Sequence, residues 1–322
     1  MKAAVIFQKG GMPQYADFPE PKISNDDELL VSVKASAIKH LDKSRASGRH
    51  YSAITDMQQA KVIGGDGVGI LEDGTRVFAL GISGMIAEKA VIEKSRMIKL
   101  PGGIDNATAA ALPNAVAGSA MGLLFRAGMK KGETVLINGA TGFTGKIAVQ
   151  LARYYGAKKI IATGRNAVSL QSLKHLGADE TIPTTDDEHF IDRLVKTNDD
   201  SPIDIVIDYL WGHTAELIFM SLKGKGSFTH KVRFVSIGAV TGDKIQLSAE
   251  ILRSVDLQLS GSGLGSWTKD EMHKLFIEII PEAFQLAADN KLKVETVTVS
   301  LKDIEKLWEM EVTDGKRLVI TM

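Results

Sequence analysis

A stretch from Val135 to Ala157 has the clearest potential for chemistry, because an apolar run ends there in glycines and a helical pattern follows (VLINGATGFTGKIAVQLARYYGA). The first amides of a helix have no partners within it and lie at the positive end of its dipole, so they bind anions. Gly142 would let a pyrophosphate approach the backbone, and Gly145 would let helix and strand pack closely. The alternative is an ordinary turn, since Ala140 takes the first glycine position of the common Gly-x-Gly-x-x-Gly pattern. In this context we predict a phosphate cradle, formed by Gly139, Ala140, Thr141, Gly142, Phe143, Thr144 and Gly145.

The end of the next apolar run, KIIATG, indicates which nucleotide is bound. In dinucleotide-binding folds an acidic residue about 20 residues after the glycine loop bonds the ribose of NAD. Here Arg165 follows the run with no carboxylate beside it, and a guanidinium can form a bidentate pair with a 2′-phosphate. The alternative is a solvated arginine at the start of the next helix. We therefore predict NADPH as the cofactor, bound at this point by Thr163, Gly164, Arg165 and Asn166.

The surrounding elements follow two patterns. Residues 1–113 contain short alternating or apolar runs separated by Gly, Pro, Asp and Asn, which predict a β-rich domain. From Asn114 onward strands alternate with helices, which predicts a doubly wound parallel sheet. The final segment returns to strand, helix and strand. We therefore predict an α/β chain in which a dinucleotide-binding domain (114–263) is inserted into a β-rich substrate domain (1–113 and 264–322).

Ends of the later predicted strands supply further candidate cofactor residues, because ligands of open parallel sheets bind at the carboxyl ends of the strands. These candidates are Asp208, Ile237, Gly238, Ser262 and Gly263.

Composition excludes several classes of protein. Lys+Arg and Asp+Glu number 39 each, so the net charge of +0 argues against a nucleic-acid partner. The absence of cysteine excludes disulfides and thiolate metal sites. No stretch of about 18 consecutive apolar residues suggests a membrane span. The N-terminal run MKAAVIFQKGG predicts a strand rather than a signal peptide, and the expected location is the cytoplasm.

Several segments resemble, in order and spacing, the medium-chain dehydrogenase/reductase superfamily and specifically its zinc-free quinone oxidoreductase (zeta-crystallin-like) branch. They are VKASAIKHLD, GGDGVGI, AAALPNAVAGSA, GETVLINGATGFTGKIAVQLARYYGAK, LKHLGADETI, IDIVIDYLWG and GKRLVI. The resemblance covers nearly the whole chain. It implies a Rossmann domain inserted into a GroES-like domain, a small electrophilic substrate, and a homodimer that pairs the edge strand around VDLQLSGSG.

The resemblance also indicates whether the protein binds zinc. Zinc-dependent relatives would carry a cysteine at Lys39 and a histidine at Gly65, and they would contain a four-cysteine zinc loop. Zinc needs three or four such ligands. We therefore predict an enzyme that works without zinc and has no metal site.

In the resemblance, the substrate pocket is lined by Lys39, Asp42, Tyr51, Ser119 and the glycine-rich segment SGSGLG after the sixth strand of the parallel sheet. Ser119 stands where the family carries a threonine near the nicotinamide. Hydride addition to an enone or a quinone builds negative charge on the carbonyl oxygen, which a cation or a hydroxyl group stabilises. Lys39 or Tyr51 could do this, and Asp42 could either touch substrate or cap a short helix. Lys39 replaces the usual asparagine, and His50 takes the usual tyrosine position ahead of Tyr51. These changes leave the substrate open.

We therefore expect an NADPH-dependent, zinc-independent oxidoreductase that transfers hydride to a quinone or an α,β-unsaturated carbonyl compound (an enone or enal). The alternative is a non-catalytic NADPH-binding relative with a structural or regulatory role, in which the substrate cleft has decayed. Consumption of NADPH with a panel of quinones and enones distinguishes the two.

Overall fold

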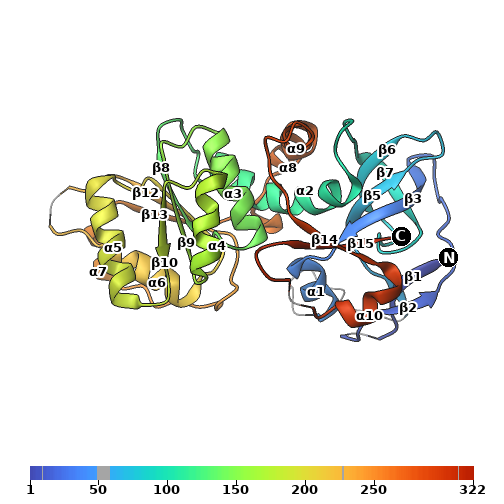
Figure 1. Cartoon of the computed structure of the whole chain (residues 1–322), viewed down its shortest axis with the longest axis horizontal. Helices are drawn as coiled ribbons and strands as arrows, with labels where there is room; N and C mark the ends of the chain where they lie inside the picture. The colour runs from blue at the N-terminus through green and yellow to red at the C-terminus, as the bar shows by residue number, and fades with distance from the viewer. Residues whose placement is uncertain (9, 49–58, 227, 311) are drawn as a thin grey trace. The chain divides into compact units, whose positions relative to one another are not determined.

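The structure, a computed structural model, describes residues 1–8, 10–48, 59–226, 228–310 and 312–322. It contains two compact units (Figure 1). The parallel-sheet unit comprises residues 114–275, and the β-rich unit comprises residues 1–113 and 276–322. The chain has the expected α/β class, with one unit built on a parallel sheet and the other rich in β-strands.

The parallel-sheet unit is built on one sheet with the strand order β10–β9–β8–β11–β12–β13, in which all neighbours run parallel. The strands are β8 (Thr134–Asn138), β9 (Lys159–Gly164), β10 (Glu180–Pro183), β11 (Ile205–Asp208), β12 (Val232–Ser236) and β13 (Leu257–Gly261). Every residue of β8 and β11 is buried, as expected for strands covered on both faces. This burial explains why these strands are continuous apolar runs in the sequence.

Helices follow the strands and cover the sheet. They are η1 (Met121–Arg126), α3 (Phe143–Tyr154), α4 (Ala167–Ser172), η2 (Leu173–Leu176), α5 (Asp187–Asp200), α6 (Gly212–Ser221), α7 (Ala249–Ser254), η3 (Leu264–Ser266) and α8 (Lys269–Lys274). Helix α3 contacts β8 and β9, and α5 contacts α6 and β10. Phe190, Phe219 and Phe234 lie fully buried in the core on the α5–α6 side.

The β-rich unit contains two sheets. One has the order β2–β1–β4, and the other β14–β15–β3–β5–β6–β7. Because β3 pairs with β7 as well as with β5, strands β3, β5, β6 and β7 form a closed circuit of hydrogen-bonded neighbours. The strands are β1 (Lys2–Ile6), β2 (Gln14–Asp17), β3 (Glu28–Ala37), β4 (Lys61–Val62), β5 (Asp66–Ile70), β6 (Arg76–Gly81), β7 (Lys89–Lys99), β14 (Thr296–Ser300) and β15 (Arg317–Thr321). The helices are α1 (His40–Ala46), α9 (Ile280–Ala288), η5 (Leu301–Asp303) and α10 (Ile304–Leu307).

Two helical segments contain the borders between the units. The first border falls between Pro113 and Asn114, inside α2 (Asn106–Ala120). The second falls after Leu275, within η4 (Leu275–Ile279), whereas the sequence pattern places the return at Leu264. The segment before Leu275 stays with the parallel-sheet unit because Arg126 bonds to it at Ser266 and Glu271.

One helix differs from the expectation that no segment could cross a membrane. The continuous helix of α2 and η1, Asn106–Arg126, has 21 residues and is long and apolar enough to do so by length and composition. Within its most apolar window, 72% is buried inside the protein, as in a core helix. The sequence reading missed it because its apolar residues are interrupted by Asn, Thr, Ser and Gly.

Candidate nucleotide-binding site

The carboxyl ends of the parallel strands bring most of the predicted cofactor residues to one edge of the sheet. The register pairs Asn138 of β8 with Asp208 of β11. It also pairs Asp208 with Ser236 of β12, and Ser236 with Gly261 of β13. The loops that follow these residues therefore lie at the edge where open α/β sheets bind their ligands.

The three glycines of the loop between β8 and α3 differ in backbone conformation and in the space that a Cβ would find at each position. Gly139 has a φ of +83°, and a Cβ there would lie 2.9 Å from the Leu210 side chain. A Cβ on Gly145 would lie 2.5 Å from the carbonyl oxygen of Gly139 and 2.6 Å from Cα of Ala140. Gly142 has no such need, because the nearest atom to its Cβ would be the Gly139 oxygen at 3.6 Å. Among the described residues, and apart from its chain neighbours, no second atom lies within 4 Å of that Cβ.

Backbone bonds hold this loop in place. The amide of Ala140 donates to the carbonyl oxygen of Thr163 at 2.9 Å, and the amide of Gly142 donates to that of Gly139 at 3.3 Å. Gly142 is the N-cap of α3 and offers no side chain to the amides of the first turn, which begins at Phe143. The open space at Gly142 therefore coincides with the positive end of a 12-residue helix.

The end of β9 lies against the glycine loop. A Cβ on Gly164 would lie 2.7 Å from Cγ2 of Thr141, so a larger residue here would force the Thr141 side chain to move. Arg165 follows with an exposed side chain, and no ion pair to it is found within the described parts of the chain. Asn166 is the N-cap of α4, and its Oδ1 accepts the amide of Ser169 at 2.9 Å. Arg165 can thus reach a ligand, while the oxygen of Asn166 already serves the helix.

Two of the predicted cofactor residues, Thr163 and Asp208, belong to a buried polar network. Thr163 donates from Oγ1 to Oδ1 of Asn138 at 2.7 Å, and Nδ2 of Asn138 donates to Oδ1 of Asp208 at 2.8 Å. Asp208 also accepts the amides of Leu210 and Trp211, the latter with a φ of +58°. Burial raises the pKa of Asp208. These side chains join three strand ends beneath the glycine loop and fix the turn after β11.

Ser119 also lies in the interior. It is fully buried in α2, with its Oγ 2.9 Å from the hydroxyl of Tyr209 and 3.3 Å from the carbonyl oxygen of Thr144. Burial raises the pKa of Tyr209. The predicted contact of Ser119 with a cofactor remains a prediction. Tyr209 was missed by the sequence reading, and its place directly after Asp208 at a strand end was the available signal.

Ile237 and Gly238 continue the edge at the end of β12. Their amides donate to the carbonyl oxygen of Asp208 at 2.8 and 3.3 Å. A Cβ on Gly238 would lie 2.6 Å from the carbonyl oxygen of Tyr209, so the two loops are in close contact here.

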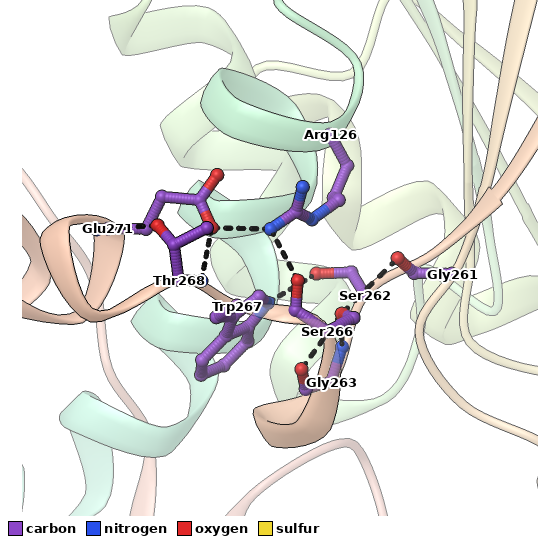
Figure 2. A network of polar contacts seen from close by, with 8 residues as sticks. All are labelled: Arg126, Gly261, Ser262, Gly263, Ser266, Trp267, Thr268 and Glu271. Carbon is purple, nitrogen blue, oxygen red and sulfur yellow. Dashed lines mark hydrogen bonds and ion pairs between the residues drawn. The ribbon is translucent and has the colours of Figure 1, made fainter.

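Ser262 and Gly263 follow β13 and begin a compact loop, shown in Figure 2. The indole Nε1 of Trp267 donates to Oγ of Ser262 at 3.0 Å. The amide of Gly263 donates to Oγ of Ser266 at 3.0 Å. Both predicted residues are thus engaged within the loop.

In the β-rich unit, two of the predicted substrate residues form part of a buried ion cluster. Nζ of Lys39 lies 2.7 Å from Oδ1 of Asp66, 3.0 Å from Oδ2 of Asp42 and 3.0 Å from the carbonyl oxygen of Ala37. The side chain of Lys39 is only 3% exposed. An ammonium has three hydrogens. A direct contact of Lys39 with a substrate, which stays a prediction, would require one of these bonds to open.

The cluster contains two cations, Lys39 and Arg317, and two carboxylates, Asp42 and Asp66, so its charges balance. Arg317 is also buried, and burial lowers its pKa to about 10 despite the nearby carboxylates of Asp42 and Asp66. Burial disfavours the charge of Lys39, but the two carboxylates outweigh it and raise the pKa of the ammonium. Burial raises the pKa of Asp66. Asp42 additionally accepts the Lys39 amide at 3.0 Å, so it caps α1, the alternative considered for it.

The remaining expectations concern Tyr51 and metal. Tyr51 lies outside the described residues. Within the residues that the structure describes, no group of three or more His, Cys, Asp or Glu side chains could hold a metal ion. Zinc independence stays a prediction.

Comparisons with known proteins give the relatives of this chain. A family model described as zinc-binding dehydrogenase matches residues 144–282. A probable NADPH-dependent quinone reductase of Emericella nidulans is 26% identical, over 96% of this chain and 96% of that protein. A chloroplastic NADPH-dependent alkenal/one oxidoreductase of Arabidopsis thaliana is 30% identical, over 58% of this chain and 53% of that protein.

A solved structure extends the likeness to the fold of the whole chain. The quinone oxidoreductase of Thermus thermophilus, also solved with NADPH, matches with a TM-score of 0.78 at 24% identity and covers 100% of both chains. The dehydrogenase model lies mostly on the parallel-sheet unit, whereas the Emericella nidulans relative and this structure also include the β-rich unit. With both units matched in one chain, the comparisons support the medium-chain dehydrogenase/reductase superfamily, in its quinone oxidoreductase branch, as the family of this protein.

Proposed function

We propose that this protein is an NADPH-dependent oxidoreductase that reduces a quinone or an α,β-unsaturated carbonyl compound without zinc. The observation that carries the proposal is the open space at Gly142, at the start of α3 and at the carboxyl edge of the parallel sheet. Relatives described as quinone and alkenal/one oxidoreductases support the reaction class.

The residues present fit a dinucleotide phosphate. A side chain at Gly142 would fill the place where we put the pyrophosphate, and in the described part of the chain only the Gly139 oxygen, at 3.6 Å, comes near a Cβ there. Arg165 adds an exposed cation at the end of β9, where a 2′-phosphate would distinguish NADPH from NADH. When bound, the nicotinamide supplies the hydride. The chain itself binds the phosphates through the first turn of α3 and orients the cofactor along the strand ends.

Arg165→Ala is expected to weaken NADPH binding while NADH binding barely changes. The variant loses charge-assisted hydrogen bonds worth about 1.5–3 kcal/mol, which corresponds to a loss of roughly 10- to 150-fold in affinity. The loss should shrink at high salt, because an exposed ion pair is screened. Isothermal titration of both cofactors measures it. Equal weakening of NADPH and NADH would mean that Arg165 acts on structure, and the choice of NADPH would lose its main support.

Catalysis should survive strong chelators. We expect the purified protein to contain no stoichiometric zinc, and NADPH oxidation with a quinone to proceed at the same rate after treatment with a chelator. Elemental analysis and the rate before and after treatment measure this. Activity that falls on chelation and returns with zinc would overturn the zinc-free part of the proposal.

An NADPH-binding protein without turnover is the second candidate, favoured by the engagement of all three Lys39 hydrogens in the protein. A panel of quinones, enones and enals with NADPH decides between the two. Turnover of any panel member supports the enzyme, whereas binding of NADPH without turnover across the panel supports the second candidate.

We also propose a homodimer. Strand β13 is one of the two edge strands of the parallel sheet, and Leu259 within it is partly exposed. A second copy of β13 would satisfy its unpaired backbone groups. Light scattering after size-exclusion chromatography measures the mass, and a monomer at micromolar concentration would contradict this proposal.

A further inference from the structure

The loop after β13 is a flexible sequence held in one conformation by polar contacts. It carries glycines at 261, 263 and 265, and Leu264 within it is exposed. Glycines lose the most conformational freedom when a chain is ordered. Apart from the partly buried Trp267, the loop has little apolar burial to offset that loss. Its hydrogen bonds must therefore keep it in place.

Arg126 supplies the contact from outside the loop. Its Nη2 donates to the carbonyl oxygen of Ser266 at 2.8 Å and pairs with Oε2 of Glu271 at 2.5 Å (Figure 2). The same carboxylate oxygen accepts the amide of Thr268 at 2.8 Å. Arg126 is the last residue of η1, a π-helical continuation of α2, and such segments are frequent at functional sites. The loop is thus tied to a core helix.

The position of the loop indicates what this contact serves. The proposed 2′-phosphate site lies after β9 and the pyrophosphate site after β8, so the cofactor extends across the strand ends toward β11, β12 and β13. We propose that Arg126, with Glu271, is a positioning residue that orders the 261–267 loop in advance for the nicotinamide half of the cofactor. This inference rests on the proposed function.

Stability alone is a poor explanation for this arrangement. Among the described residues no acceptor reaches the buried Nε of Arg126. A buried donor without a partner is costly, so this pair is not optimised for folding. If the loop is already ordered before the cofactor binds, by contrast, the free energy of binding does not include the entropy cost of ordering the loop.

The same unit contains a matched ion pair for comparison. Nη2 of Arg233 lies 2.5 Å from Oε1 of Glu133, and its Nη1 donates to the carbonyl oxygen of Ala127 at 2.8 Å. The two side chains are 15% and 18% exposed, compared with 20% and 17% for Arg126 and Glu271. Arg233 lies near the amino end of β12, away from the strand ends that carry the proposed site. A substitution of Arg233 therefore measures how much stability the protein loses when such an ion pair is removed.

The test compares Arg126→Met with Arg233→Met in the full chain. Arg126→Met should lose no more stability toward urea than Arg233→Met does. Only Arg126→Met should speed hydrogen exchange in the segment 257–268 of the free protein. If the ordered population of the loop falls to about a tenth, the Kd for NADPH rises about tenfold. Arg233→Met should leave that Kd within about twofold, and Arg126→Lys, which restores a donor, should recover part of the affinity.

A double variant adds a second readout. Glu271→Met alone should raise the Kd in the same way, and Arg126→Met with Glu271→Met should raise it no further than Arg126→Met alone, because the two residues act through one contact. A Kd that rises equally in Arg126→Met and Arg233→Met would overturn the proposal, as would faster exchange of the loop with unchanged Kd. In both cases the wild type still binds NADPH. A wild type that does not bind NADPH overturns the proposed function itself, and the role of Arg126 with it.

Discussion

Gly142→Val is expected to abolish detectable NADPH binding while the chain still folds. The backbone at Gly142, with φ −74° and ψ 164°, is extended and accepts a β-branched residue. A Cβ there would meet its nearest protein atom at 3.6 Å, an ordinary contact. The added methyl groups would instead occupy the space in which we place the pyrophosphate. Titration with NADPH measures the loss, and circular dichroism with urea unfolding measures the fold.

Two further glycines serve as controls for this result. Gly102 has nothing within 4 Å of a Cβ, so Gly102→Val should leave both folding and NADPH binding unchanged. Gly145→Ala should damage the fold itself, because its Cβ would lie 2.5 Å from a backbone oxygen that cannot move aside. If Gly142→Val binds NADPH as the wild type does, the loop is only a turn and the cofactor site lies elsewhere.

Lys39→Met should be the most destabilising of the substitutions proposed for the β-rich unit. It removes the ammonium that lies within 3.0 Å of two nearly buried carboxylates, those of Asp42 and Asp66. Removing one partner of a buried ion pair typically costs about 3–5 kcal/mol, because the remaining charge is left buried without compensation. Arg317 interacts with both carboxylates but cannot replace the short contacts. Urea unfolding at neutral pH measures the difference in free energy of unfolding.

A paired variant keeps this prediction testable if Lys39→Met does not fold. Combining Lys39→Met with Asp66→Asn removes one of the uncompensated charges, so the double variant should be more stable than Lys39→Met alone. Lys2→Met breaks the exposed pair with Asp17 and should scarcely change stability, since solvent screens that pair. Equal stability of wild type and Lys39→Met would show that the cluster contributes nothing to folding.

Local sequence patterns were sufficient to predict much of the region in which we place the cofactor. The glycine loop, the strand before it and the helix after it are neighbours in the chain, so their junction could be recognised from spacing. Arg165 follows its strand directly, and its exposure in the structure agrees with a residue available to a ligand. The reason is physical: parallel strands with helical crossovers place every carboxyl end at one edge, whatever the details of packing.

Contacts between residues distant in the chain could not be obtained in this way. Lys39 meets Asp66 across 27 positions, and Arg317 reaches Ile38 across 279. Asn138 joins Asp208 across 70. A polar side chain is compatible with solvent, a ligand or a buried partner, and its sequence neighbours do not choose among them. The sequence by itself determined the α/β class and the glycine loop, because these depend on local periodicity and turn chemistry, and its segments, in their order and spacing, carried the resemblance to the family. Only the tertiary structure decided that Lys39, Asp42, Asp208 and Ser119 are bonded within the protein, because burial removes water and leaves protein groups as their partners.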